Sequence, residues 1–152
     1  MTRLLVDTNV FLRSLDPASP HYVECRDALA HIRVTGLPVC ISSQVLSEFW
    51  SVATRPKVNN GMGLEFADAA EQLEEINLVF PCLPEPPDLA TRWWYLIRKH
   101  RVVSKQAHDT RLVAFMLGHG LDVLVSLNAK DFARFTEIRC VTPAELLADA
   151  GA

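Results

Sequence analysis

Long apolar runs are missing from this chain of 152 residues, although hydrophobic residues make up 49% of it. No run approaches the ~20 apolar residues that a membrane-spanning helix needs, so the sequence argues against a membrane protein. The stretch before Asp7 is too short for a signal peptide and lacks a small-residue cleavage site. We therefore expect a cytoplasmic protein.

Cysteine motifs and an excess of basic residues are missing as well. The four cysteines are widely spaced and form no CxxC pair, which speaks against a zinc site or a redox motif. The formal charge of −3 argues against sequence-blind nucleic-acid binding. The charge is uneven, however, with an acidic segment at 65–75 and a basic one at 92–105. Both can be solvated helix faces, and the basic one can equally attract phosphate.

What the sequence does contain is short apolar runs that alternate with longer amphipathic segments. The runs predict five strands: Leu4–Val6, Val39–Ile41, Leu78–Phe80, Val123–Leu127 and Ile138–Val141. Helical spacing and capping residues predict helices near 8–12, 20–34, 43–54, 64–76, 89–100, 107–119 and after 143. Strands that alternate with helices indicate an α/β fold with a mostly parallel sheet, here in a single domain of residues 1–152.

Polar and acidic side chains stand where two of these strands end. Asp7 follows the first strand directly. Asn128 follows the strand that begins at Val123, and Asp131 comes three residues later. Ligands of open parallel sheets bind beyond the carboxyl ends of the strands, so we expect these side chains at one common edge.

Two helix carboxylates stand near apolar faces. Asp109 shares its predicted face with Leu112, Val113 and Met116. Burying an unpaired carboxylate costs several kcal/mol, and a helix N-terminus returns only ~1 kcal/mol of that. A bound metal ion would offset the cost. Glu48 borders the apolar face of its own helix and gives a weaker signal.

Each of these side chains has an ordinary alternative that is the better one when the residue is taken singly. Asp7 can be a helix cap, and Asp109 can stabilise the first turn of its own helix. Glu48 can pair with a surface base, and the residues at 128 and 131 can form a turn. Together, several acids without matched basic partners favour a site for Mg²⁺ or Mn²⁺, which prefer carboxylate oxygens.

The motifs around these residues resemble the PIN-domain ribonucleases, and in particular the VapC-type toxins of prokaryotic toxin–antitoxin pairs. The matching pieces are Leu5-Val6-Asp7-Thr8-Asn9-Val10, Ser47-Glu48-Phe49, His108-Asp109-Thr110 with Leu112-Val113-Ala114, and Ser126-Leu127-Asn128-Ala129-Lys130-Asp131-Phe132. The likeness covers nearly the whole chain. No single piece is specific, but the order and spacing of the set are.

The resemblance implies a three-layer PIN-like fold with a central, mostly parallel sheet of five strands flanked by helices. It also implies that Asp7, Glu48 and Asp109 hold Mg²⁺ or Mn²⁺. Asn128 stands at a fourth position, where family members commonly have Asp or Asn, and Asp131 could supplement it.

Further residues have supporting or RNA-binding roles in this interpretation. The small polar side chains that match family positions beside the site are Thr8, Asn9 and Ser126. Charge and position alone suggest contacts to an RNA backbone at Arg13, Arg55, Lys57 and the basic group from Arg98 to Arg101.

The activity that the resemblance implies is that of a metal-dependent endoribonuclease toxin, which cleaves RNA by means of a metal-activated water. Members of the family usually cut structured RNA such as tRNA or ribosomal RNA. They form homodimers and are inhibited by an antitoxin peptide in a groove, which here would involve the helices at 43–54 and 64–76.

Two other functions remain open from the sequence. A phosphatase of the haloacid dehalogenase type would use Asp7 as its nucleophile, but that family has a second Asp where this chain has Asn9. A non-catalytic PIN module would only bind RNA or an antitoxin, and the neutral Asn128 would then mark a lost site.

Overall fold

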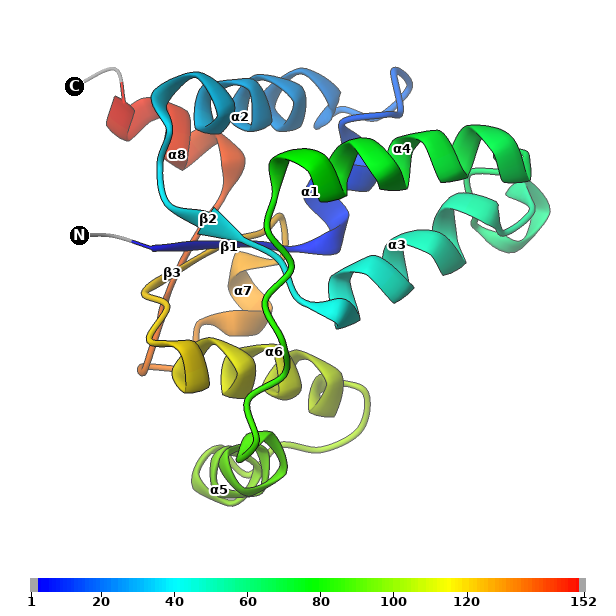
Figure 1. The fold of residues 1–152 in the computed structure, drawn as a ribbon. Coiled ribbons are helices and arrows are strands. Elements are labelled where there is room, and N and C mark those ends of the chain that lie inside the picture. Colours follow the sequence, from blue (N-terminus) through cyan, green and yellow to red (C-terminus); the bar gives the residue numbers. More distant parts are fainter. Residues whose placement is uncertain (1–2, 151–152) are drawn as a thin grey trace.

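The computed structural model describes residues 3–150 and shows a parallel sheet between two layers of helices (Figure 1). The strands are β1 (Leu4–Val6), β2 (Val39–Cys40), β3 (Val123–Val125) and β4 (Arg139–Val141). Their order is β2-β1-β3-β4, and every neighbouring pair is parallel. The α/β class and the parallel sheet are thus confirmed.

The helices lie close to their predicted positions. They are α1 (Thr8–Arg13), α2 (Tyr22–Thr35), α3 (Ser43–Thr54), α4 (Phe66–Val79), α5 (Leu89–His100), α6 (Gln106–His119), α7 (Ala129–Phe132) and α8 (Pro143–Ala150), with a 3₁₀ turn at Lys57–Asn59. In Figure 1, α2 and α8 cover one side of the sheet, and α5 and α6 lie on the other. The short helix α7 was not predicted, and a turn was only the ordinary alternative for residues 128 and 131.

The core lies around the two central strands. Every residue of β1 and β3 is buried, and Leu5, Val6, Leu124 and Val125 have no exposed surface. A strand with a neighbour on each side and helices on both faces needs apolar residues throughout, which explains the uninterrupted apolar runs. These strands are also the ones whose carboxyl ends carry the predicted site.

The predicted strand at Leu78–Phe80 is wrong, and the sheet of residues 3–150 has four strands rather than five. Helix α4 continues through this apolar run to Val79, and Phe80 ends the helix as its buried C-cap. Leu78 is 86% exposed, so the run is one turn of an amphipathic helix and not a buried strand.

The chain meets the sheet edge slightly later, where Cys82 forms a single parallel bridge with Ile41. The Ile41 N–H donates to the Pro81 carbonyl (2.9 Å), and the Leu83 N–H donates to the Ile41 carbonyl (3.1 Å). Pro81 and Pro84 lack N–H groups and cannot extend this ladder. The fifth strand is therefore reduced to one bridge.

No helix in residues 3–150 combines the length and the apolar character that crossing a bilayer requires. The predicted domain limits at residues 1 and 152 lie outside the described residues, and the single domain over the whole chain stays a prediction.

Candidate functional site

Asp7 lies at the carboxyl end of β1 and is 8% exposed. Its N–H continues the sheet by donating to the Val125 carbonyl (2.9 Å). Its Oδ1 accepts a hydrogen bond from the Thr8 N–H (2.8 Å), so Asp7 is the N-cap of α1. The capping alternative is thus correct, but it uses only one of the two carboxylate oxygens.

The other oxygen of Asp7 faces the end of β3. Ser126 Oγ donates to Asp7 Oδ2 at 2.7 Å, and Asn9 Nδ2 donates to the same oxygen at 3.3 Å. Asn9 Oδ1 accepts from the Leu127 N–H (3.0 Å), and Ser126 Oγ accepts from the Asn128 N–H (3.0 Å). The ends of the two central strands are therefore joined by a polar network around one buried carboxylate.

Glu48 reaches this network from α3. It was expected partly on the apolar face of its helix, but the residue is exposed. Its carboxylate is nevertheless held at both oxygens: Thr8 Oγ donates to Oε2 (3.0 Å) and Gln44 Nε2 donates to Oε1 (3.1 Å). Two hydrogen bonds, and not burial, direct Glu48 toward the end of β1.

Asp109 lies in the first turn of α6 and is half-buried. Its pKa is raised to about 6, first by burial and then by the negative charges of Asp7, Asp131 and Glu48; His108 opposes the rise. The pKa of Asp7 is also raised, mainly by burial and further by Glu48, against the hydrogen bonds that it accepts. Charge interactions weaken with distance, so these shifts place the four carboxylates in one electrostatic neighbourhood.

The four carboxylates have no basic ion-pair partner within residues 3–150. None of the ion pairs in that range involves Asp7, Glu48, Asp109 or Asp131. No guanidinium or ammonium group in the described part of the chain therefore pairs directly with them.

Two residues were predicted at the fourth acidic position of the family, Asn128 and, as its supplement, Asp131. Asn128 is the N-cap of α7 and is exposed, and its side chain makes no capping hydrogen bond. Asp131 lies in the first turn of α7 and its charge raises the pKa of Asp109. The charge in this segment therefore comes from Asp131, while Asn128 contributes its backbone N–H to Ser126.

These residues fit a hard divalent cation. Carboxylate oxygens are its preferred ligands, and carboxylates with raised pKa values and no cationic partner gain most from its charge. However, no three Asp, Glu, His or Cys side chains within residues 3–150 lie close enough to form a ready-made metal cage. A cation bound here would therefore need water or substrate oxygens to complete its coordination shell, as is usual for Mg²⁺.

The basic residues proposed for RNA contacts are dispersed. Arg13 is half-buried and pairs with Asp16 at 3.3 Å. Arg55 and Lys57 follow the far end of α3 and are exposed. Arg98 and Arg101 are exposed at the end of α5, the helix that packs on α6. Arg101 ends α5, and a short loop leads from there to α6, the helix that carries Asp109.

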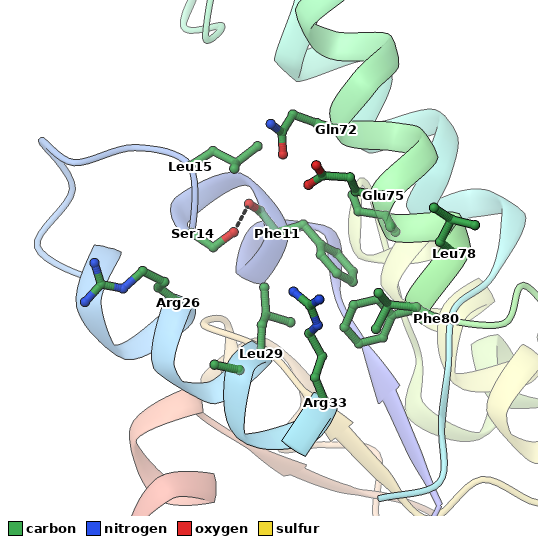
Figure 2. Close-up of a pocket in the computed structure, with 13 residues that line it drawn as sticks. Phe11, Ser14, Leu15, Arg26, Leu29, Arg33, Gln72, Glu75, Leu78 and Phe80 are labelled. Carbon is green, nitrogen blue, oxygen red and sulfur yellow. Dashed lines mark hydrogen bonds between the residues drawn. The ribbon is translucent and has the colours of Figure 1, made fainter. Parts of the chain in front are cut away.

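A separate cavity of about 480 Å³ lies between α1, α2 and α4 (Figure 2). Its apolar wall includes Phe11, Leu29 and Phe80, and the side chains of Arg33 and Glu75 stand around it. None of the acidic-site residues lines this cavity. The cavity is lined by α4 but not by α3, and an antitoxin groove that involves the helices at 43–54 and 64–76 stays a prediction.

Sequence reasoning missed Gln44, which binds Glu48 and also contacts α6. Its only sequence signal is the spacing of four residues before Glu48, which places both side chains on the same helix face.

An open parallel sheet with uncompensated acids beyond the ends of its central strands defines the class: an α/β protein with an acidic site at the carboxyl edge of the sheet. The family model described as PIN domain matches residues 4–138. The chain therefore belongs to the PIN domain family, and the resemblance seen in its motifs is confirmed. No curated protein is significantly similar to it in sequence.

Solved structures share the fold over nearly the whole chain. VapBC2 from Rickettsia felis, bound to a DNA fragment from its promoter, has a TM-score of 0.71 at 14% identity and covers 93% of this chain and 98% of its own. DNA-bound VapBC from Salmonella typhimurium has a TM-score of 0.68 at 20% identity, with 94% and 99% covered. VapC20 from Mycobacterium tuberculosis, a toxin that cleaves the sarcin-ricin loop, has a TM-score of 0.65 at 20% identity, with 90% and 98% covered.

Proposed function

We propose that this chain is a VapC-type toxin: an endoribonuclease that depends on Mg²⁺ or Mn²⁺ and hydrolyses RNA phosphodiester bonds. The observation that carries the proposal is that the charges of three other acids act on Asp109, and that none of these four carboxylates forms an ion pair within residues 3–150. A protein retains such a costly arrangement where a cation and a phosphodiester are to be bound.

In this proposal Asp7, Glu48 and Asp109 hold the cation, and Asp131 adds negative charge at the fourth position. A bound divalent cation lowers the pKa of a water molecule and stabilises the charge that grows on the phosphodiester. Ser126 and Asn9 fix the orientation of the Asp7 carboxylate by their hydrogen bonds.

The RNA would approach from the side of α5. Arg98 and Arg101 are exposed there, and the Arg98 guanidinium lies 5.5 Å from the ring centre of Trp94, which is 52% exposed. Cationic and aromatic side chains together suit a phosphate backbone with unpaired bases. Since VapC20 from Mycobacterium tuberculosis cleaves a ribosomal RNA loop, ribosomal RNA and tRNA are the first substrates to test.

The proposed partner is a cognate antitoxin. The relatives from Rickettsia felis and Salmonella typhimurium are VapBC assemblies, and one from Klebsiella pneumoniae is a toxin–antitoxin complex. The cavity between α1, α2 and α4 offers Phe11, Leu29 and Phe80 to apolar side chains of an antitoxin segment. The homodimer and the cytoplasmic location stay predictions.

The test is RNA cleavage by the purified full chain. Labelled tRNA and a ribosomal RNA loop are incubated with the protein in Mn²⁺, in Mg²⁺ and in EDTA. We expect cleavage with the metals and none with EDTA, and a loss of more than about 100-fold in Asp7→Asn and Asp109→Asn. Asp68→Asn makes the same chemical change at an exposed position on α4, away from the proposed RNA side, and should retain the wild-type rate.

Two outcomes would replace the proposal by an alternative. A phosphorylated Asp7 trapped from a phosphoester substrate, without RNA cleavage, would support the phosphatase. RNA binding with no cleavage in any metal, unchanged in Asp7→Asn and Asp109→Asn, would support the non-catalytic module.

A further inference from the structure

The side-chain amide of Gln44 joins three parts of the molecule. Its nitrogen donates to Glu48 Oε1 (3.1 Å) and to the backbone carbonyl of His108 (3.0 Å). Its oxygen accepts from Arg111 Nη1 (2.9 Å). Gln44 and Glu48 belong to α3, whereas His108 and Arg111 belong to α6, and His108 directly precedes Asp109.

Only one orientation of this amide satisfies its neighbours. Glu48 and the His108 carbonyl can only accept hydrogen bonds here, and the guanidinium of Arg111 can only donate. A flipped amide would set its oxygen against two acceptors and its NH₂ against a donor, and would lose all three bonds. The amide is therefore locked with its NH₂ toward Glu48, which removes the usual ambiguity of glutamine side chains.

The Arg111 guanidinium has a carboxylate partner of its own outside the proposed metal ligands. It pairs with Glu85, whose Oε1 also accepts a hydrogen bond from Ser43 Oγ (3.1 Å). Arg111 therefore meets Glu48 only through the neutral amide of Gln44. An arginine bound directly to Glu48 would occupy the carboxylate and compete with a metal ion for it.

Glu48 depends on such a support because it is exposed. A free glutamate side chain on a helix surface has many rotamers, and fixing it costs roughly 1–2 kcal/mol of conformational entropy. Thr8 holds one oxygen from the α1 side, and Gln44 holds the other from within α3. Gln44 also binds the backbone beside Asp109, so it fixes one acid relative to the other.

We propose that Gln44 is a positioning residue, which orients the Glu48 carboxylate and braces it against the start of α6 where Asp109 lies. This inference rests on the proposed function, because it assigns a support to one of the three proposed metal ligands. Gln44 itself touches neither the metal nor the RNA, and acts through Glu48.

The test compares the full chain with Gln44→Met, which keeps the length of the side chain but removes the three hydrogen bonds. Supporting residues of metal ligands are typically worth 10–100-fold in affinity or activity. We expect the Kd for Mn²⁺, measured by calorimetry without RNA, to rise about 10-fold. In saturating Mn²⁺ we expect kcat to fall while KM for RNA stays within 2-fold.

The matched control is Gln106→Met, the same chemical change in the first turn of α6. Within residues 3–150, the Gln106 side chain makes no hydrogen bond, so its Kd for Mn²⁺ should equal that of the wild type. The amide signals of Gln44, assigned by their loss in Gln44→Met, should shift when Mg²⁺ is added to the wild-type chain and should stay unmoved in Glu48→Gln.

The outcomes separate this inference from the proposed function. If the wild-type chain binds Mn²⁺ and cleaves RNA, but Gln44→Met has the same Kd and kcat, the positioning role is wrong. The role is equally wrong if Gln44→Met only lowers the melting temperature, because that result would make Gln44 a purely structural contact. If the wild-type chain neither binds Mn²⁺ nor cleaves RNA, the proposed function fails first and the positioning role falls with it.

Discussion

Asp109 and Glu137 are both partly buried carboxylates, and the molecule treats them in opposite ways. Glu137 binds Lys99 Nζ (2.9 Å) and His100 Nε2 (3.0 Å). Burial opposes its ionisation, but the hydrogen bonds from these two bases outweigh it and lower its pKa. Asp109 has only acids and a weakly opposing His108 around it, and its pKa rises to about 6. Basic side chains therefore pair with Glu137, whereas none within residues 3–150 forms an ion pair with the acids near the ends of β1 and β3.

The difference separates a structural carboxylate from a functional one. Glu137 fastens the segment before β4 to the end of α5, so its ion pairs stabilise the fold. Neighbouring acids contribute to the raised pKa values of Asp109 and Asp7, which costs stability that a bound cation can return.

The largest expected effect is therefore metal-dependent stabilisation at the acidic site alone. Mn²⁺ at 100 times its Kd should stabilise the wild-type chain by about 2.7 kcal/mol, and EDTA should reverse this. Asp109→Asn should lose most of the stabilisation, whereas Glu137→Gln should keep it. The measurement is the melting temperature of each variant at pH 7.5 with Mn²⁺ and with EDTA. An equal response of both variants to Mn²⁺ would show that the cation binds elsewhere.

A smaller effect distinguishes the two candidates for the fourth position. Because the charge of Asp131 contributes to the raised pKa of Asp109, whereas Asn128 is neutral, Asp131→Asn should weaken Mn²⁺ binding about 10-fold, or ~1.4 kcal/mol. Asn128→Ala should change the Kd by less than 2-fold, since the structure uses its backbone N–H and not its side chain. Calorimetric titration of both variants checks the assignment. A larger rise in Kd for Asn128→Ala than for Asp131→Asn would show that Asn128 fills the fourth position.

The sequence predicts the parts of this site that depend on local pattern. Asp7 was found because an uninterrupted apolar strand ends there, and Asp109 because it shares a helix face with buried residues such as Leu112 and Val113. In both cases the periodicity of one element carries the information. The same reasoning fails at Leu78–Phe80, because three apolar residues in a row suit the end of a helix as well as a strand.

The support of Glu48 lies beyond local pattern. Thr8 is 40 residues away from it in the chain, and the carbonyl that fixes Gln44 lies 64 residues from Gln44. A neutral glutamine on a helix carries no distinctive signal, so only the packing of α3 against α1 and α6 reveals its role. The pairing of Glu137 with Lys99 and His100 was not predicted for the same reason, because these bases lie 38 and 37 residues from it in the chain.

Without metal, the two acids should respond to neutralisation with opposite signs. Asp109→Asn removes an ionised group that its surroundings disfavour, so at pH 7.5 in EDTA its melting temperature should rise by about 2–4 °C, or ~1 kcal/mol after solvent screening. Glu137→Gln removes the negative charge that pairs with Lys99 and His100 and should lower the melting temperature. Thermal unfolding in EDTA checks both, and a fall in Asp109→Asn would mean that its charge is stabilised within the fold.

The smallest expected effect is the pH dependence of these two differences in melting temperature. It tests directly whether they arise from the ionisation of Asp109 and Glu137. The pKa of Asp109 is raised from 3.8 to about 6 in the folded chain, so the folded state binds the proton more tightly than the unfolded state. The cost of its ionisation is absent below about pH 4, grows between pH 4 and 6, and is complete above that range. The advantage of Asp109→Asn should therefore vanish near pH 4 and reach its full value by about pH 7.

Glu137 has the opposite sign, because its pKa in the folded chain lies below the ordinary value of 4.5. Its stabilisation is present above that value and is lost only as the pH falls through the lower, folded pKa. Between pH 5 and 7 the Glu137 carboxylate stays ionised, so the deficit of Glu137→Gln should not follow the growing advantage of Asp109→Asn. Melting curves in EDTA at half-unit steps of pH measure both trends. Parallel trends in the two variants would mean that Asp109 titrates as an ordinary surface carboxylate, and the shared acidic site would then have no electrostatic basis.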